Sequence, residues 1–324
     1  MILGIIEHDR GNVNAVSLEM LTLARDLAGK LNASLQAVVV GEEGRPLADV
    51  LQGYGVDKVH LVTHEALDDY APEAWARSIV QLIEETSPQG VVAPGTDRGN
   101  EVLAHVAALA ELPMAANCTD VEPGDDYQVT RVRWGGSLLE EARLNGTPKL
   151  LSVAPHVIEA TEAAQAAEAT VKAFTPTLDD KAFRVRITKR VDTSGDRVSL
   201  SDADIVVGGG RGVGSAEGFA DLDELAEFLN GAVGGSRVVT NLGWRPHADQ
   251  IGQTGTRIAP ELYIACGISG AIQHMVGAKG SKKILAINTD REAPIMSKAD
   301  YAVIGDLHEI LPALIEELKK RKGL

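Results

Sequence analysis

Four segments in the last third of the chain combine glycines with the hydroxyl, amide and cationic side chains that bind phosphates and nucleotides. They are residues 208–215, 234–237, 250–255 and 269–274. Glycine lets the backbone approach a ligand closely, and backbone N–H groups in such loops bind anions. A tight turn would explain any one of these segments, and Ser269 could be a helix cap. Four of them in one short domain indicate an extended dinucleotide ligand.

Arg237 and His274 are the side chains in these segments that could stabilise negative charge on a cofactor. A flavin ring that gains one electron carries negative charge around N1 and O2, and a nearby cation or hydrogen-bond donor lowers its energy. A lone histidine in the first turn of a helix is more often structural. The segments contain no Ser-His-Asp, paired-carboxylate or metal-ligand spacing. The pattern therefore predicts a site that tunes a cofactor, and the cofactor carries the chemistry.

The glycine-rich segment 208–215 matches an NAD-binding fingerprint poorly. It follows a predicted strand and precedes a predicted helix, as that fingerprint requires. However, Ser215 stands where the fingerprint has Gly or Ala. The next predicted strand, residues 237–240, is followed by Asn241 and not by the acidic residue that would bind a ribose. An NAD-dependent enzyme is the weaker reading of this segment.

Alternating apolar runs and helical repeats predict parallel βαβ units on either side of a polar stretch. In the first half we expect strands at 3–6, 35–40, 59–62 and 90–93, and helices at 13–31, 47–51, 72–85 and 101–109. Residues 128–134, 140–144 and 150–153 predict a β-rich extension, 160–173 a weak helix or loop, and 183–189 an exposed strand. In the second α/β block we expect strands at 204–207, 237–240, 262–265, 284–288 and 301–305, and helices at 220–229, from 271 and at 307–319.

The predicted fold class is thus α/β, with two domains and a linker. Residues 1–190 form a parallel-sheet α/β domain with a β-rich extension, and residues 191–204 are the linker. Residues 205–324 form a doubly wound α/β domain that contains all four segments. A chain of 324 residues is consistent with about two domains.

Composition excludes several classes of partner. A net charge of −15 disfavours nucleic-acid binding, which needs a basic face, and disfavours adsorption to an anionic membrane. Cys118 and Cys266 lie far apart in no paired motif, so we expect neither a disulfide framework nor a metal site. The N-terminus lacks a signal-peptide pattern, and no segment approaches the ~20 apolar residues of a membrane span. We expect a cytoplasmic protein.

The C-terminal segments resemble the α subunit of electron-transfer flavoproteins. The resemblance is dense from about residue 208 to 307 and rests on Gly209-Gly210-Arg211-Gly212, Gly235-Ser236-Arg237 and residues 250–255, 259–263, 267–274, 286–288, 292–295 and 299–301. The N-terminal half is similar in layout, with residues 95–98 and 117–120 as weaker matches. One departure is Thr256, where many relatives carry Lys, although Arg257 supplies a charge nearby.

The resemblance implies one FAD, held mainly by the C-terminal domain. Carried over by position, the FAD-binding residues are Arg211, Ser236, Arg237, Ile251, Gly252, Gln253, Thr254, Ser269, Gly270, Ala271, Ile272, Gln273, His274, Asn288, Asp306 and Leu307. Arg237 would lie over the isoalloxazine, Thr254 would reach N5 and His274 would face O2. Asn288 and Asp306 would hold the adenosine end.

The resemblance also implies an electron carrier, and not a stand-alone enzyme, that pairs with a β subunit. Electrons would pass from flavin dehydrogenases to a membrane quinone oxidoreductase or another acceptor, by simple transfer or in a bifurcating complex. A second nucleotide, AMP or another FAD, would belong to the β subunit, and the N-terminal domain would form part of the subunit interface without binding a nucleotide. The alternatives are an NAD-dependent enzyme and a stand-alone nucleotide sensor built on the N-terminal βαβ units.

Overall fold

The computed structural model describes residues 1–67, 69–189, 198–201 and 203–322. The chain forms two compact units, Met1–Val191 and Asp192–Leu324. The linker that the sequence predicts at residues 191–204 falls largely outside the described residues, so its exact extent stays a prediction. Within the described residues, no helix is both long and apolar enough to cross a membrane.

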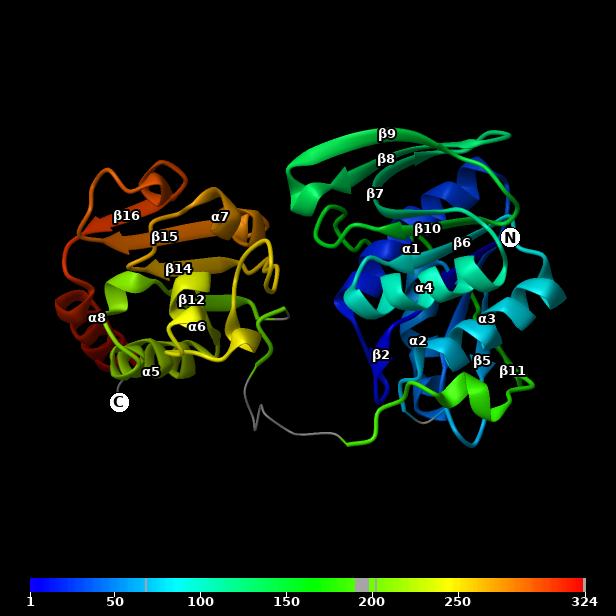
Figure 1. Cartoon of the computed structure of the whole chain (residues 1–324), viewed down its shortest axis with the longest axis horizontal. Helices are drawn as coiled ribbons and strands as arrows, with labels where there is room; N and C mark the ends of the chain where they lie inside the picture. The colour runs from blue at the N-terminus through cyan, green and yellow to red at the C-terminus, as the bar shows by residue number, and fades with distance from the viewer. Residues whose placement is uncertain (68, 190–197, 202, 323–324) are drawn as a thin grey trace. The chain divides into compact units, whose positions relative to one another are not determined.

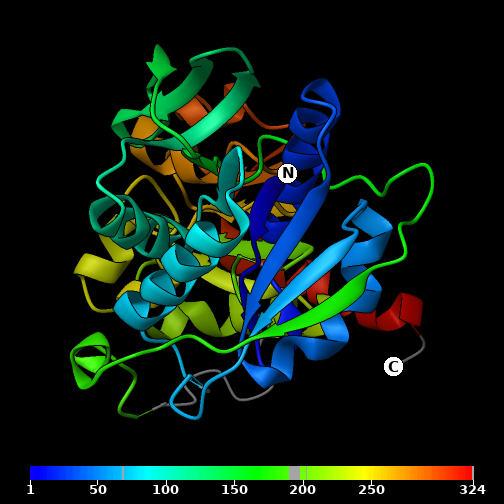
Figure 2. The same cartoon turned by 90° about the vertical axis from the view of Figure 1, so that its right-hand side faces the viewer.

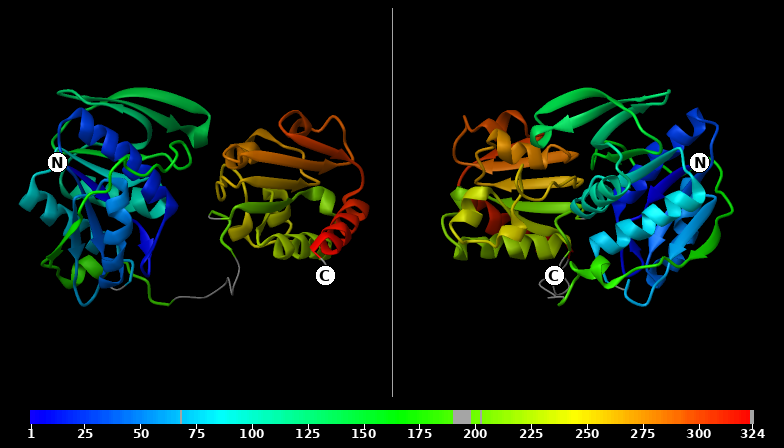
Figure 3. Two further views of the ribbon diagram at one scale, coloured as in Figure 1. Left: turned by 180° about the vertical axis from the view of Figure 1, so that it is seen from behind. Right: turned by 45° about the vertical axis from the view of Figure 1, so that its right-hand side comes forward.

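The first unit is built on a nine-stranded sheet in the order β11-β5-β4-β1-β6-β10-β7-β8-β9. Seven neighbouring strands are parallel: β11 (Thr170–Phe174), β5 (Lys58–Val62), β4 (Leu35–Val40), β1 (Ile2–Ile5), β6 (Gly90–Pro94), β10 (Lys149–Val153) and β7 (Met114–Glu122). β8 (Tyr127–Arg133) and β9 (Leu138–Leu144) continue the sheet antiparallel and form two of the three strands predicted for the β-rich extension (Figure 3). The third, predicted at residues 150–153, is β10, which lies within the parallel part of the sheet. A short hairpin of β2 (His8–Asp9) and β3 (Asn12–Val13) follows β1.

Helices cover both faces of this sheet, as parallel strands require. α1 (Ala15–Lys30) buries Met20, Leu21 and Leu27 on one face, near the short α2 (Ala48–Leu51). α3 (Pro72–Thr86) and α4 (Asp97–Leu109) bury their apolar sides on the other face. Side-chain caps begin two of these helices: the Asn14 side chain accepts from Val16 N, and Thr96 accepts from Gly99 N.

The second unit has a parallel five-stranded sheet in the order β13-β12-β14-β15-β16. Its strands are β12 (Ile205–Gly209), β13 (Ala232–Gly235), β14 (Leu262–Cys266), β15 (Lys283–Asn288) and β16 (Tyr301–Ile304). α5 (Ala220–Leu229) and α8 (Leu307–Lys322) pack together on one face (Figure 1), and α7 (Ile272–Ala278) packs on the other. This doubly wound order reverses direction between β12 and β14, the position where such sheets bind ligands. The predicted α/β fold class is confirmed.

One strand of the second unit is not where the sequence predicts it. Residues 237–240 form helix α6 (Arg237–Asn241), and the strand is the preceding Ala232–Gly235. The β-branched pair Val238 and Val239 favours a strand. In the structure both residues are helical, and the Val239 side chain packs into the core. The register pairs Gly208 with Gly234 and Gly209 with Gly235, so the segment 234–237 closes a strand and does not open one.

Three further expectations in the first unit were wrong or incomplete. The end of the segment 160–173, expected to be weak helix or loop, belongs to β11, which lies beside β5 at the sheet edge (Figure 2). Residues 183–189, expected to be an exposed strand, contain none in the structure, although a 3₁₀ turn spans Asp180–Phe183. The sequence also missed β7. Pairing with strands that are distant in the sequence determines β7 and β11, and local alternation does not reveal such pairing.

Candidate functional site

A cleft of about 670 Å³ lies at the carboxyl edge of the second sheet, in the size range of cofactor sites. Its walls come from the loops that follow β12, β13, β14 and β15, together with the segment 250–254. The lining residues are Gly210, Arg211, Gly212, Ser236, Arg237, Val238, Gln250, Ile251, Gly252, Gln253, Thr254, Gly267, Ile268, Ser269, Ala271, Gln273, His274, Asn288, Asp290 and Ala293. The cleft therefore spans the switch point between β12 and β14.

The structure brings most of the predicted site residues into this one cleft. Those that line it are Arg211, Ser236, Arg237, Ile251, Gly252, Gln253, Thr254, Ser269, Ala271, Gln273, His274 and Asn288. Gly270, Ile272, Asp306 and Leu307 are not among the lining residues. Asp306 accepts a hydrogen bond from His308 N, 2.9 Å away, at the start of α8, and Leu307 is buried in the core.

The glycine-rich loop after β12 uses its backbone amides within the protein. Gly210 N donates to Cys266 O (2.8 Å), Gly212 N donates to Gly267 O (3.1 Å), and Gly214 N donates to Arg211 O (3.1 Å). A Cβ at position 210 would lie 2.2 Å from the Gly267 carbonyl oxygen. These glycines let two loops meet at the switch point. Since those three amides are engaged within the protein, they are not available to a phosphate as the amides of an NAD fingerprint are.

Two arginines point to an anionic ligand. Arg211 and Arg237 line the cleft and are exposed in this chain. No ion pair to either guanidinium occurs among the described residues. In a chain with a net charge of −15, two such cations in one cleft suit a phosphate or an electron-rich ring.

Gln250 is a cleft residue that the sequence did not single out. Its buried side chain connects two hydroxyls: Thr240 Oγ1 donates to Gln250 Oε1 (3.0 Å), and Gln250 Nε2 donates to Thr254 Oγ1 (2.9 Å). Because Thr254 accepts from Gln250, its own hydroxyl proton is available to an acceptor in the cleft. The sequence shows a polar side chain at position 250. Its hydrogen bond to Thr240 could not be foreseen, because Thr240 lies on helix α6, where the sequence predicted a strand.

His274 is a neutral group in this structure. It is 7% exposed, and burial lowers its pKa to about 4, with the Ile251 backbone carbonyl acting in the opposite direction. Its Nε2 lies 2.8 Å from the Tyr263 hydroxyl. Of the two roles that the sequence left open, a cation or a hydrogen-bond donor, burial favours the donor at pH 7.

Comparisons with known proteins agree with this geometry. Residues 2–179 match the family model of the electron transfer flavoprotein domain. Residues 199–279 match the electron transfer flavoprotein FAD-binding domain. The chain belongs to the electron transfer flavoprotein family, on the alpha-subunit side. FAD as the cofactor and electron carriage as the role, both predicted from the resemblance, are confirmed at the level of this family.

The similarity extends over the whole chain. Electron transfer flavoprotein subunit alpha from Megasphaera elsdenii is 36% identical, covering 99% of this chain and 96% of that protein. The subunit alpha from Mycobacterium leprae is 39% identical, covering 98% of each chain. Protein FixB from Clostridium saccharobutylicum is 36% identical, covering 97% of this chain and 95% of that protein.

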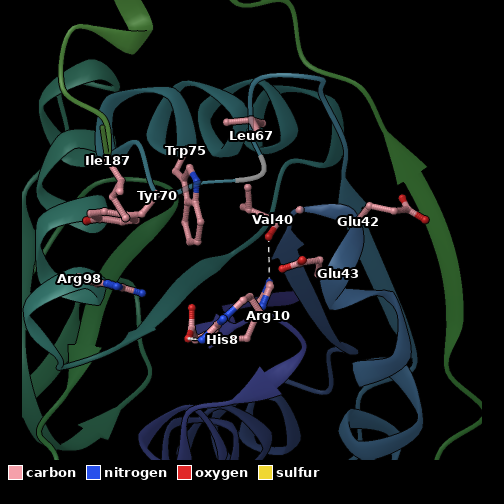
Figure 4. A pocket seen from close by; sticks show the side chains of 12 residues that line it. His8, Arg10, Val40, Glu42, Glu43, Leu67, Tyr70, Trp75, Arg98 and Ile187 are labelled. Carbon is pink, nitrogen blue, oxygen red and sulfur yellow. Dashed lines mark hydrogen bonds and ion pairs between the residues drawn. The ribbon is translucent and has the colours of Figure 1, made fainter. Parts of the chain in front are cut away.

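The first unit of this flavoprotein subunit has a much smaller pocket at the corresponding sheet edge. It measures about 30 Å³, room for one or two water molecules, and its residues include His8, Arg10, Tyr70, Trp75 and Arg98. Figure 4 shows Tyr70 and Trp75 among the side chains that line this pocket. The Tyr70 and Trp75 rings meet edge to face at 5.2 Å, and Arg98 stacks on Tyr70 at 5.1 Å. This packing argues against the nucleotide-sensor alternative.

The Gln250 network yields a first prediction. Gln250→Leu should weaken FAD binding and lower the free energy of unfolding of the second unit by about 1–3 kcal/mol, because it leaves buried polar groups unpaired. Flavin-binding titration and urea unfolding measure the two effects. Gln81→Leu, at an exposed hydrogen bond to Thr177 in the first unit, is the matched control and should leave FAD affinity unchanged. An unaltered affinity of Gln250→Leu would contradict the role of Gln250.

The low pKa of His274 yields a second prediction. The folded ring resists protonation down to about pH 4, whereas an unfolded histidine binds a proton near pH 6.5. The stability that His274 contributes is therefore complete above pH 6.5 and falls by about 1.4 kcal/mol per pH unit as the pH drops toward 4. Urea unfolding of the flavin-free protein across this range should show a shallower loss for His274→Ala. Identical slopes for the two proteins would show that His274 titrates normally.

Proposed function

We propose that this chain binds one FAD in the cleft of its second unit and, with a β subunit, shuttles electrons from flavin dehydrogenases to a quinone oxidoreductase or another acceptor. The observation that carries the proposal is the convergence of most of the predicted FAD-binding residues on one cleft at the switch point. The full set of predicted site residues, including Gly270, Ile272, Asp306 and Leu307, belongs to this proposal. The cytoplasmic location stays a prediction.

The residues of the cleft fit an elongated dinucleotide. The loops after four neighbouring strands contribute, which at about 4.8 Å per strand spacing gives a wall that is longer than one nucleotide. Arg211 and Arg237 offer uncompensated positive charge, and the buried Nδ1 of His274 has no hydrogen-bond partner among the described residues. These are the features expected where a flavin and a pyrophosphate are to be held.

In this proposal the chain binds and tunes, and the flavin supplies the one- and two-electron chemistry when bound. Arg237 offers a cation to the electron-rich part of the ring system. Thr254, held by Gln250, directs its hydroxyl proton into the cleft. His274 offers a neutral donor. Asn288 connects the loops after β14 and β15, because its Nδ2 donates to Ile268 O (3.0 Å) and its Oδ1 accepts from Asp290 N (3.0 Å).

The first unit supplies, in this proposal, part of the contact with the β subunit. Its antiparallel extension exposes large apolar side chains, with Trp134 at 78%, Leu138 at 56% and Leu139 at 71% exposure. Large apolar side chains exposed around one β-hairpin are typical of protein–protein interfaces. An NAD-dependent enzyme is the second candidate function, and the internally bonded amides of the loop after β12 weigh against it.

The proposal is tested with the co-purified α and β subunits. We expect a yellow heterodimer in which FAD is reduced by a reduced flavin dehydrogenase and reoxidised by a quinone oxidoreductase. A colourless heterodimer that cannot be reconstituted with FAD would contradict the proposal, and saturable nicotinamide binding in the cleft would favour the NAD alternative. The nucleotide released from the β subunit separates the two modes of transfer: a second FAD indicates bifurcation, and AMP indicates simple transfer.

A further inference from the structure

Tyr263 and His274 form a buried hydrogen-bonded pair behind the wall of the cleft. Tyr263 lies on β14 with no exposed surface, and its hydroxyl is 2.8 Å from His274 Nε2 on α7. Gly208 on β12 makes room for that hydroxyl, because a Cβ at this position would lie 2.4 Å from Tyr263 Oη. Gly208 therefore serves the placement of a side chain, whereas the sequence suggested a contact with phosphate.

The positions of the protons follow from counting hydrogen-bond partners. Burial keeps the Tyr263 pKa well above 10 and the His274 pKa near 4, so at pH 7 the hydroxyl has its proton and the ring has one. If Nε2 carried the ring proton, it would donate to the Tyr263 oxygen. Two groups would then lack a partner among the described residues: the Tyr263 hydroxyl proton would have no acceptor, and the buried Nδ1 would have no donor. If Tyr263 donates to Nε2, only the Nδ1 proton lacks a partner. The second arrangement leaves fewer buried polar groups unpaired.

The second arrangement leaves a buried Nδ1–H group on a residue of the cleft. His274 lines the cleft, and its Nδ1 is buried without a hydrogen bond to any described residue. The Ile251 backbone carbonyl also favours a proton on this ring. Because Nε2 faces the Tyr263 hydroxyl, the proton that this carbonyl favours is the one on Nδ1. A donated bond from Tyr263 further polarises the ring and makes Nδ1–H a stronger donor.

We infer that Tyr263 is a positioning residue that holds His274 in its Nδ1–H form, so that the ring presents a neutral hydrogen-bond donor to the electron-rich edge of the flavin. The inference rests on the proposed function and adds to it a residue that does not line the cleft. Through Tyr263, the protein would set the donor strength of His274 without placing a second charge beside the ring.

The ring proton can be observed directly. We propose ¹⁵N-histidine NMR on the αβ heterodimer, with FAD bound and after FAD removal, with the His274 signals assigned by their loss in His274→Ala. The wild-type protein should show Nδ1 protonated and Nε2 unprotonated at pH 7. Tyr263→Phe should give a mixture of both forms. An Nε2–H ring in the wild-type protein would overturn the inference.

The flavin reports the same arrangement independently. Tyr263→Phe should lower the equilibrium constant for one-electron reduction of the bound FAD by about 2- to 10-fold, the range that one neutral hydrogen bond spans. The effect should vanish in a His274→Ala background, because Tyr263 acts through His274. Tyr127→Phe, a buried tyrosine of the first unit, is the matched control and should cause no change. An equal effect of Tyr263→Phe with and without His274 would overturn the inference.

A failure of the proposed function can be told apart from a failure of this inference. A heterodimer that binds no FAD contradicts the proposed function, and the ring-proton measurement on the flavin-free protein still decides the role of Tyr263. Gly208→Ala provides a second route, because its Cβ must displace the Tyr263 hydroxyl. It should shift the His274 ring proton in the same direction as Tyr263→Phe, and an unaltered Nδ1–H ring would contradict the inference.

Discussion

Arg237→Ala should lower the one-electron reduction potential of the bound FAD by the equivalent of about 1–4 kcal/mol. Arg237 has no ion-pair partner among the described residues, so its charge is not already neutralised by the protein. A cation about 4 Å from developing negative charge contributes about 1 kcal/mol in water and about 4 kcal/mol at the effective dielectric constant of a partly buried site. A β subunit that covers the flavin would move the effect toward the upper value. Redox titration of the purified heterodimer measures it.

The control for Arg237→Ala must remove the same charge elsewhere in the unit. Arg321→Ala serves this purpose, because Arg321 lies on α8 in an exposed ion pair with Glu317 and does not line the cleft. Its potential should equal that of the wild-type protein, and Arg237→Lys should give an intermediate value, since Lys keeps the charge and loses the planar guanidinium. A wild-type potential in Arg237→Ala with FAD still bound would show that Arg237 does not act on the ring.

Gly210→Ala should abolish stable FAD binding by separating the two loops at the switch point. The added Cβ would lie 2.2 Å from the Gly267 carbonyl oxygen and 2.7 Å from the Ile268 Cα, both of them backbone atoms that cannot rotate away. Relief requires a backbone shift, and overpacking of this kind costs about 1–3 kcal/mol. The shift would also disturb the hydrogen bond from Gly210 N to Cys266 O, which joins the loops after β12 and β14.

Gly29→Ala is the matched control for Gly210→Ala. Gly29 lies in α1, and a Cβ there would meet no atom within 4 Å. This substitution should stabilise the helix by about 0.5–1 kcal/mol and leave the flavin content unchanged. Thermal unfolding and the ratio of flavin to protein absorbance measure both variants. Full flavin content in Gly210→Ala would show that the loops tolerate separation.

The residues that line the cleft could be predicted from the sequence where ligand binding and backbone geometry favour the same residue types. Glycines and hydroxyl side chains mark the segments 208–215 and 269–274, which follow strands, and the segment 250–255, so their combination in one short domain could be recognised in the sequence. Side chains that act from behind the cleft leave no such mark. Tyr263 reads as one more apolar residue in a buried strand, and its pairing with His274 appears only when α7 packs on β14.

The errors in the predicted fold have a related physical origin. Residues 237–240 have the β-branched composition of a strand, yet the parallel register with β12 assigns that role to the more glycine-rich Ala232–Gly235. The register is defined by the pairing of two strands, so it cannot be predicted from the sequence of one segment alone. The same holds for β11, whose partner β5 precedes it by more than a hundred residues.

The loops of the cleft are tied to one another by the protein's own backbone. Ser236 N donates to Gly209 O (2.9 Å), Ile251 N donates to Gly235 O (2.8 Å), and Gln253 N donates to Gln273 O (2.8 Å). Such a frame keeps its shape without help from a ligand, so little conformational entropy is lost when one enters. Stripping the flavin should therefore be reversible: the colourless protein would regain its colour on simple mixing with FAD, without a refolding step.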